Sequence, residues 1–402
     1  MTRTVDRWSY LALALGSASY GCLLFVWFLL PAFLSPVIED LGLSGWQAGV
    51  LVGAVPLTYI PLSLVSGLAI DRVGPRWGVG LGLLIFGAAG AARGFAPDFP
   101  WMLALTLLVG VGATGITFGL PKLVAALFPP ERIGSASTVY VLGSYAGSAS
   151  AFAIGRPVLG PALGGWRPVF VRSGLAVLAF AVVWFLGTAR ITPRDADDGR
   201  TFSIGSLRED AGRVLSNRSM ALLVAIGTAY LLVNHGLQGW LVTVFESRGV
   251  RPALAGLTTT VLVAGQAVGA LSIPPLSDRL SARRQAVVLS GALVTGGTTI
   301  LLLSESTLSI AAGGIVAVGI GLGGIGPLLR AIPVELEGIG PGLTATAVGF
   351  VFAVGEVGGF LGPFLVGSLR DATGSFVPGL GAIALAGLTI AVTGWRMTGV
   401  DS

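Results

Sequence analysis

Charged side chains are scarce in this sequence. Asp, Glu, Lys and Arg make up 11% of its 402 residues, against about 25% in typical soluble domains, whereas apolar residues make up 53%. Lysine occurs only at Lys122 and histidine only at His235, although arginine is frequent. So little charge argues against an ordinary soluble domain and indicates a membrane protein.

The chain also lacks the residues that many catalytic centres need. Its only cysteine, Cys22, excludes an internal disulfide and a cysteine metal cluster. One cysteine and one histidine cannot build a metal site or a thiol–imidazole pair, which argues against an intramembrane enzyme. A phosphate loop of the form G-x-x-x-x-G-K-[ST] is absent, and the glycine-rich stretch VGIGLGGIG (318–326) suits close helix packing. We therefore expect no enzymatic activity, no metal and no cofactor.

Long apolar segments are abundant. A segment of about 20 residues spans the ~30 Å hydrocarbon core of a bilayer as a helix. Twelve such segments recur, at residues 8–34, 46–70, 77–95, 101–127, 137–160, 168–188, 219–246, 252–276, 285–303, 309–333, 342–368 and 376–397. The first is too long for a signal peptide, so we expect it to be retained. Alternation with period two, which a membrane barrel requires, is absent. The predicted fold class is all-α, an integral membrane protein with twelve transmembrane helices.

The arginines are distributed unevenly between the two sides of the predicted membrane. If the N-terminus is cytoplasmic, fifteen lie in inner segments: Arg3, Arg7, Arg72, Arg76, Arg132, Arg190, Arg194, Arg200, Arg208, Arg213, Arg218, Arg279, Arg283, Arg284 and Arg396. The outer loops hold four: Arg167, Arg248, Arg251 and Arg370. Because positive residues collect on the cytoplasmic side, we predict a multi-pass plasma-membrane protein with both termini in the cytoplasm. The same bias, rather than nucleic-acid binding, explains the net charge of +5.

The chain divides into two similar halves. A polar stretch, ARITPRDADDGRTFSIGSLREDAGRVLSN, separates the sixth and seventh segments, and DRVGPR (71–76) and DRLSAR (278–283) share the frame D-R-x-x-x-R on either side of it. At a constant offset of 206, these residues also match: Pro121 and Pro327, Ile133 and Ile339, Gly134 and Gly340, Gly143 and Gly349, Pro157 and Pro363. We infer an internal duplication in parallel orientation. The predicted domains are six-helix bundles at 1–189 and 218–402, pseudo-symmetric and joined by a cytoplasmic linker at 190–217.

These features resemble the major facilitator superfamily over essentially the whole chain. The stretch GLAIDRVGPR follows the second segment, and LSDRLSARR echoes it after the eighth. The family motif, roughly G-x-x-x-D-R-x-G-R-[KR], is matched at Gly67, Asp71, Arg72, Gly74 and Arg76, and not at Pro75 and Trp77. The stretches PKLVAALFPPERIGSASTVY and GFLGPFLVGSLRDATGSF are similar to the cyanate-permease and nitrate-porter-like branch of anion carriers. Nitrate porters have an intramembrane arginine in helices two and eight, which this chain lacks, and this argues against nitrate itself.

The resemblance implies where several residues lie. In the family, helices one, four, seven and ten line a central cavity, which implies that Lys122, His235 and Arg330 lie on cavity helices. Arg156 and Glu356 would lie on helices five and eleven, behind the cavity or at its rim. The cytoplasmic D-R frames would form an inner gate, in which Asp71 caps a helix N-terminus of the other half. The predicted gate residues are Asp71, Arg72, Arg76, Asp278, Arg279 and Arg283.

Two titratable residues lie deep in predicted helices. Glu356 is about 21 Å into its segment, near the membrane midplane, and its own helix offers no cation. A charge at that depth costs about 2.5–3.5 kcal/mol, so Glu356 is either a protonatable coupling residue or half of a buried pair with an arginine or histidine of another helix. His235 shares a polar helix side with Asn234 and Gln238. That pattern fits hydrogen bonds between helices, and also substrate contact or a proton relay.

The intramembrane cations are the candidates for binding an anion. Lys122 and Arg330 lie at similar depth in the fourth and tenth segments, with extension to the membrane surface or gate packing as the alternative. Lys122 aligns with Leu328 in the repeat, so the two cations are out of register. Arg156 fits a structural pairing and a ligand role equally.

Two further arginines lie close to the outer ends of their segments. These are Arg93, in the third segment, and Arg172, in the sixth. A long side chain near a helix end can extend its charge to the interface. We therefore expect both arginines to reach the membrane surface.

The sequence thus predicts a secondary active transporter of a small anionic solute, working by alternating access of its two halves around a midplane site. Protonation of Glu356 or His235 would couple transport to a proton, and the predicted substrate-binding candidates are Lys122, Arg330, His235, Asn234, Gln238 and Arg156. An efflux transporter of amphipathic cations or drugs is an alternative, although the surplus of intramembrane cations opposes it. A non-transporting membrane sensor is another. The expected partners are the lipid bilayer and a small-molecule substrate, with no nucleic acid, and the expected state is a monomer.

Overall fold

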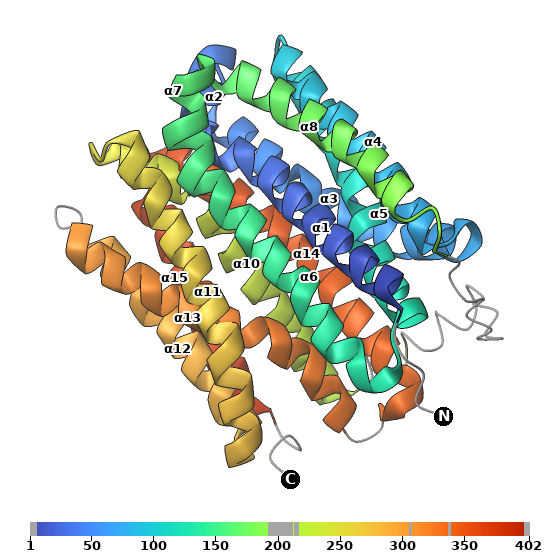
Figure 1. The fold of residues 1–402 in the computed structure, drawn as a ribbon. Coiled ribbons are helices and arrows are strands. Elements are labelled where there is room, and N and C mark those ends of the chain that lie inside the picture. The colour runs from blue at the N-terminus through green and yellow to red at the C-terminus, as the bar shows by residue number, and fades with distance from the viewer. Residues whose placement is uncertain (1–5, 192–211, 213–216, 305–307, 337–338, 398–402) are drawn as a thin grey trace. The chain divides into compact units, whose positions relative to one another are not determined.

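The described part of the chain is helical almost throughout (Figure 1). The computed structural model describes residues 6–191, 212, 217–304, 308–336 and 339–397. In chain order its elements are α1 (Arg7–Ala32), α2 (Leu34–Leu41), α3 (Gly45–Val73), α4 (Pro75–Ala92), η1 (Arg93–Phe95), α5 (Phe99–Leu127), α6 (Pro130–Ser150), η2 (Ala151–Leu159), α7 (Gly160–Leu163), α8 (Trp166–Gly187), α10 (Arg218–Ser247), α11 (Pro252–Leu280), α12 (Arg283–Leu303), α13 (Leu308–Glu335), α14 (Gly340–Thr373) and α15 (Val377–Arg396).

Each of the twelve predicted apolar segments coincides with a helix or a continuous pair of helices, which confirms the fold class. Among the described residues, ten helices are long and apolar enough to cross a membrane. α3 adds a span that bends by 64° between Gly45–Ser63 and Val65–Val73. It contains Pro56 and Pro61, each of which removes a backbone donor from the helix. The remaining segment is α6 with its π-helical continuation η2.

The chain folds as two compact units. The first comprises Met1–Leu43, Ala54–Asp198 and Pro252–Gly256, and the second comprises Ser44–Gly53, Gly199–Arg251 and Leu257–Ser402. The beginning of α3 therefore groups with the second unit, and the beginning of α11 with the first. The predicted linker at 190–217 lies mostly outside the described residues, so the predicted domain limits at 189 and 218 stay predictions.

In the first unit, glycines bring helix backbones into contact. α4 lies against α5 and α8, and α1 lies against α6 (Figure 1). A Cβ atom at Gly112 of α5 would lie 2.5 Å from the Phe86 nitrogen of α4. One at Gly147 of α6 would lie 2.7 Å from the Gly21 carbonyl carbon of α1. Because a side chain would separate these helices, the contacts require glycine.

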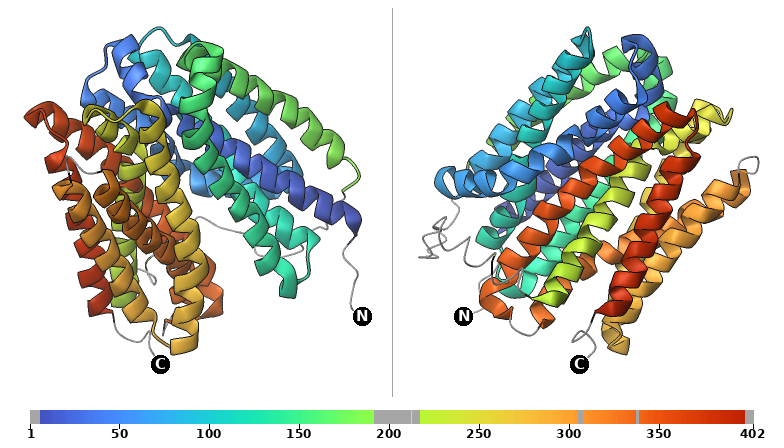
Figure 2. Two further views of the ribbon diagram at one scale, coloured as in Figure 1. Left: turned by 60° about the vertical axis from the view of Figure 1, so that its left-hand side comes forward. Right: turned by 180° about the vertical axis from the view of Figure 1, so that it is seen from behind.

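The second unit repeats this arrangement. α12 lies against α13 and α15, and α10 lies against α14 (Figure 2). A Cβ atom at Gly358 of α14 would lie 2.8 Å from the Thr228 carbonyl carbon of α10. In the glycine-rich stretch 318–326, Gly319 faces α11 at Gly265 and Gly321 faces α12 at Ser290. That stretch is therefore a packing surface, as the sequence predicted.

The beginning of α3 is held by an acidic side chain of α14. Asp371 accepts hydrogen bonds from the backbone nitrogens of Gly45, at 2.7 Å, and Trp46, at 2.8 Å. A carboxylate at a helix N-terminus satisfies donors that the helix itself leaves unpaired. An open groove of ≈ 470 Å³ adjoins this contact and is lined by Trp46, Phe364, Ser368, Asp371 and Ala372.

Candidate functional site in the second unit

His235 and Glu356 meet where α10 and α14 pack together. His235 Nε2 lies 3.8 Å from Glu356 Oε2, and the two side chains are 9% and 13% exposed. This separation is longer than a hydrogen bond, and Glu356 Oε2 has no hydrogen-bond partner among the described residues. A buried polar oxygen without a partner is costly and calls for an explanation. Both predicted coupling residues therefore lie at one place.

Three amide side chains form a second polar group. Asn234 Oδ1 accepts a hydrogen bond from Gln238 Nε2 of the same helix and another from Gln266 Nε2 of α11, each 2.7 Å long. Both glutamines are buried, and Asn234 is half-buried. The spacing of Asn234 and Gln238 predicted their shared helix side. The sequence reading missed Gln266, because one amide in the apolar stretch VAGQAVGA gives no indication of its partner.

Arg330 of α13 stacks on an aromatic ring of α14. Its Cζ lies 4.3 Å from the centroid of the Phe352 ring, and its Nη1 donates to the Gly326 carbonyl at 2.8 Å. A Cβ atom at Gly326 would lie 3.1 Å from the hydroxyl of Tyr230 in α10 and 3.8 Å from Arg330 Nη1. The guanidinium and this hydroxyl therefore approach the same glycine. Because Arg330 is exposed, its remaining N–H groups are accessible to a ligand.

Helix spacing connects these three groups. Phe352 and Glu356 are four residues apart in α14, and Tyr230 precedes Asn234 by four residues in α10, so each pair lies on one helix side. We call the following set the polar face of the second unit: Tyr230, Asn234, His235, Gln238, Gln266, Arg330 and Glu356. It combines a cation, hydrogen-bonding amides and a protonatable pair. The sequence reading missed Tyr230 and Phe352, although their spacing from the predicted residues was a usable signal.

Lys122 has its partners on α3 of the first unit. Its ammonium forms an ion pair with Asp71 and donates a hydrogen bond of 2.7 Å to the Gly67 carbonyl. The side chains of Lys122 and Asp71 are 35% and 51% exposed. The partners of Lys122 are on α3, whereas Arg330 stacks on α14, so the two cations occupy different sides of equivalent helices. This difference agrees with their positions out of register in the repeat.

The other intramembrane arginines have distinct surroundings. Arg156, on η2, is half-buried, and its Cζ lies 5.5 Å from the centroid of the Phe33 ring. Arg172 is exposed, in agreement with the prediction that it extends to the surface.

Arg93 does not extend to the surface, and that prediction is wrong. Its side chain is 1% exposed, its Nη2 donates to the Val26 carbonyl at 2.8 Å, and its Cζ lies 5.0 Å from the centroid of the Phe170 ring. Arg93 begins the short turn η1, which packs against α8. That packing directs the guanidinium inward instead of toward the membrane surface.

In the first unit, the predicted gate residues have contacts of two kinds. Asp71 is engaged by Lys122, as described above. Arg76 donates from Nε to Thr188 Oγ1 and from Nη2 to the Phe185 carbonyl, both at 3.0 Å, at the end of α8. Arg72 is exposed. These contacts fasten α3 to α5 and α4 to α8, and the gate role stays a prediction.

In the second unit, Arg283 joins the ends of three helices. It forms ion pairs with Asp278 of α11 and with Glu335 of α13, the latter at 2.9 Å. Arg279 is exposed. The sequence reading did not include Glu335. The two D-R frames are thus equivalent in sequence but have different partners.

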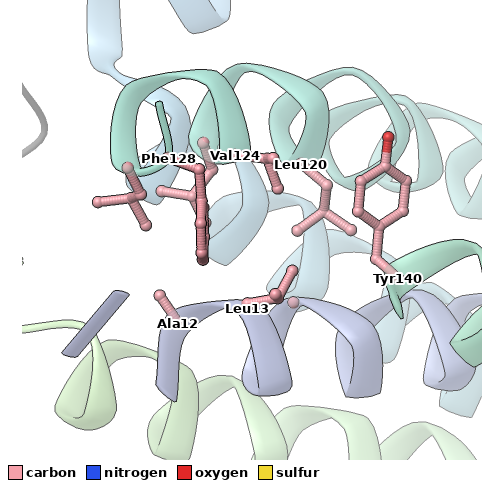
Figure 3. Close-up of a pocket in the computed structure, with 9 residues that line it drawn as sticks. Ala12, Leu13, Leu120, Val124, Phe128 and Tyr140 are labelled. Atoms are coloured by element: carbon pink, nitrogen blue, oxygen red, sulfur yellow. The ribbon is translucent and has the colours of Figure 1, made fainter. Parts of the chain in front are cut away.

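An apolar crevice lies between α1 and α5 of the first unit (Figure 3). Its walls include Ala12 and Leu13 of α1, Leu120 and Val124 of α5, and Tyr140 of α6. The crevice has no room for a water molecule. We therefore interpret it as a packing gap rather than a solute site.

Comparison with known proteins identifies the family. The family model described as Major Facilitator Superfamily matches residues 16–363. The chain belongs to the Major Facilitator Superfamily. This result confirms the resemblance carried by the D-R frames. Membership indicates a membrane-embedded transporter of small molecules rather than an enzyme.

Several relatives within the superfamily are named for anions. A putative tartrate transporter of Agrobacterium vitis is 24% identical and covers 86% of this chain and 83% of its own length. A 3-(3-hydroxy-phenyl)propionate transporter of Escherichia coli (strain K12) is 27% identical and covers 88% and 85%. A nitrite extrusion protein of Bacillus subtilis (strain 168) is 27% identical and covers 95% and 94%. These names agree with the similarity to the anion-carrier branch.

A solved structure supports the fold. The crystal structure of a bacterial homolog of the human lysosomal transporter Spinster, in an inward-facing and occupied conformation, has a TM-score of 0.77 to this chain. It is 21% identical, and the match covers 98% of this chain and 92% of that one. At this identity, the likeness establishes the superfamily fold alone.

Proposed function

We propose that this transporter moves a small anion together with a proton, by alternating access. The observation that best supports the proposal is the arrangement along α14. Phe352 holds the Arg330 guanidinium, and Glu356, one helix turn further, faces His235. A group that attracts an anion and a pair that can accept a proton therefore contact α14 one turn apart.

Carboxylates are the first candidates for the anion. A guanidinium presents a planar fork of donors that matches a carboxylate, and stacking on Phe352 orients that plane. Two relatives are named for tartrate and 3-(3-hydroxy-phenyl)propionate, and a third for nitrite. We therefore place carboxylates first and nitrite second. An amphipathic cation is disfavoured, because Arg330 would repel it.

The proton is assigned to His235 and Glu356. His235 is buried, and the buried Oε2 of Glu356 lacks a hydrogen-bond partner among the described residues. A proton on this pair changes the charge of a poorly hydrated site, and such sites respond strongly to charge. The pair is thus suited to couple proton binding to a conformational step.

We further infer a location in the plasma membrane, with both termini in the cytoplasm and the chain acting as a monomer. The arginine distribution along the sequence supports the orientation. The two D-R frames would then lie on the cytoplasmic side, where we assign them to the inner gate. Uptake and export remain alternative directions, and a sensor that does not transport is the competing function.

The decisive experiment compares Glu356→Gln with the wild-type protein in proteoliposomes. Uptake of L-tartrate, 3-(3-hydroxyphenyl)propionate and nitrite is measured with and without a pH gradient. If Glu356 carries the proton, the glutamine imitates its protonated form. Exchange of solute between the two sides should then persist, whereas accumulation driven by the pH gradient should be lost.

Glu39→Gln, on the exposed side of α2, is the matched control and should keep both activities. A wild-type protein that moves none of the three anions would refute anion transport. If Glu356 only neutralises a buried partner, removing it costs about 3–5 kcal/mol, so Glu356→Gln would melt earlier and lose exchange as well. A variant that still accumulates solute along the pH gradient would refute the assignment of the proton.

A further inference from the structure

We propose that Asn234 donates a hydrogen bond to a second oxygen of the transported anion, and that Gln238 and Gln266 are positioning residues for its amide. The inference rests on the proposed anion transport and adds a substrate class to it. That class is carboxylates with a further acceptor oxygen outside the carboxylate, such as hydroxy acids and dicarboxylates.

The hydrogen bonds give the Asn234 amide a direction. Both glutamine nitrogens donate to the same atom, Asn234 Oδ1. An amide has an acceptor end and a donor end, so two donors on one oxygen fix which end faces the glutamines. Asn234 Nδ2 then points away from them with two N–H groups. None of the described residues accepts a hydrogen bond from that nitrogen.

The two glutamines have little freedom to change this arrangement. Both are buried, and Gln238 lies one turn from Asn234 on the same helix. Gln266 is held by its backbone, because α11 presses against α13 at this point. A Cβ atom at Gly323 would lie 2.7 Å from the Gln266 carbonyl carbon. The donor end of Asn234 is therefore preorganised before any solute binds, which lowers the entropic cost of binding.

Asn234 and Arg330 lie at separate points of the polar face. Tyr230 and Arg330 approach the same glycine, Gly326, and Asn234 lies one turn from Tyr230 in α10. A carboxylate bound to Arg330 thus needs a further acceptor oxygen, outside that carboxylate, to receive a hydrogen bond from Asn234. Nitrite has no acceptor oxygen apart from those of the group that Arg330 binds.

The test measures KM and kcat for L-tartrate, 3-(3-hydroxyphenyl)propionate and nitrite in proteoliposomes. Asn234→Leu should raise the KM of a bridging carboxylate roughly tenfold or more, the usual effect of losing a hydrogen bond to a charged or strongly polar group. Any nitrite uptake should keep its KM within about twofold. Asn234→Asp should impair the carboxylate further, because it keeps both glutamine bonds and replaces the donor with an anionic acceptor.

The positioning role has its own readout. With Gln266→Met, Asn234 can turn its amide, so KM should rise roughly two- to fivefold as the competent orientation becomes less populated, with kcat little changed. In an Asn234→Leu background, Gln266→Met should add nothing, because it acts through Asn234. Gln285→Met, on the exposed side of α12, is the control and should leave KM unchanged. Melting temperatures in detergent identify any variant that fails to fold.

The outcomes separate this inference from the function on which it rests. Wild-type protein that moves none of the anions refutes both. Uptake of nitrite alone upholds anion transport and refutes the inference. A folded Asn234→Asp variant with an unchanged KM for the carboxylate also refutes it. Aspartate cannot donate this hydrogen bond, so the wild-type amide would then face the solute with its oxygen rather than its nitrogen. Additive effects of Gln266→Met and Asn234→Leu would refute the positioning role.

Discussion

At the scale of single residues, the only lysine of the chain shows how a charge is accommodated near a helix end. The Lys122 ammonium is held by Asp71 and by the Gly67 carbonyl, both on α3. The pair is partly exposed, and ion pairs of this kind contribute only about 0.2–1 kcal/mol. We therefore expect the Lys122–Asp71 pair to fix the position of α3 relative to α5 rather than to contribute much to overall stability.

We predict that exchanging the two charges is tolerated. Lys122→Asp alone places two acids together, so it should lower the melting temperature slightly and reduce uptake of L-tartrate. The double variant Asp71→Lys, Lys122→Asp restores opposite charges and should recover most of both losses. Arg172→Asp is the control. Position 172 is exposed, so adding Asp71→Lys to this variant should restore neither its melting temperature nor its uptake. If Lys122 contacts the solute instead, the double variant will fold normally but will not regain uptake.

At the scale of helices, the contact between α10 and α14 fixes the distance between His235 and Glu356. A Cβ atom at Gly362 would lie 2.9 Å from the Leu232 carbonyl carbon and 3.1 Å from the Gly236 nitrogen. Gly349 lies on the same helix, but nothing lies within 4 Å of the position of its missing Cβ. Gly362 is therefore required for the close contact between α14 and α10, whereas Gly349 is not.

We predict opposite effects of alanine at these two positions. Gly362→Ala forces α14 away from α10, and overpacking of this kind costs about 1–3 kcal/mol. It should lower the melting temperature in detergent and weaken accumulation driven by a pH gradient, because His235 and Glu356 separate. Gly349→Ala should leave the melting temperature unchanged or raise it, since it only reduces the freedom of the unfolded chain. Equal melting temperatures for the two variants would contradict this account of the contact.

At the scale of the whole molecule, the repeated units and the arginine distribution give one consistent topology. α1, α4, α5, α6 and α8 have equivalents in α10, α12, α13, α14 and α15, in the same chain order. Six spans in each half return the chain to the side on which it began. The predicted orientation depends on fifteen arginines in segments expected inside against four in loops expected outside.

We predict that the stretch between the two halves is cytoplasmic. In a variant without Cys22, a cysteine at Ser203 should be protected from an impermeant maleimide added to intact cells, and should react after lysis. A cysteine at Ser375, which follows α14, should react without lysis because that turn is predicted to be outside. Labelling of Ser203→Cys in intact cells would contradict the predicted orientation. The D-R frames would then lie on the outer side.

The sequence by itself determined the all-α membrane fold, the twelve spans and the superfamily. These depend on segment length, apolar composition and local motifs, and each can be evaluated along the chain without knowing what lies beside it. The sequence also marked Glu356, His235, Asn234 and Arg330 as residues of interest, because polar groups are costly within a membrane.

Tertiary structure alone decided which of these residues are partners. Helix rotation and crossing brought Gln266 of α11 to Asn234, His235 to Glu356, and Arg330 to Phe352. The same packing buried Arg93, which the sequence reading expected at the surface. Neighbours on different helices are set by close contacts such as those at Gly323 and Gly358. Those contacts join residues that are distant in the sequence, so a local pattern has no information about them.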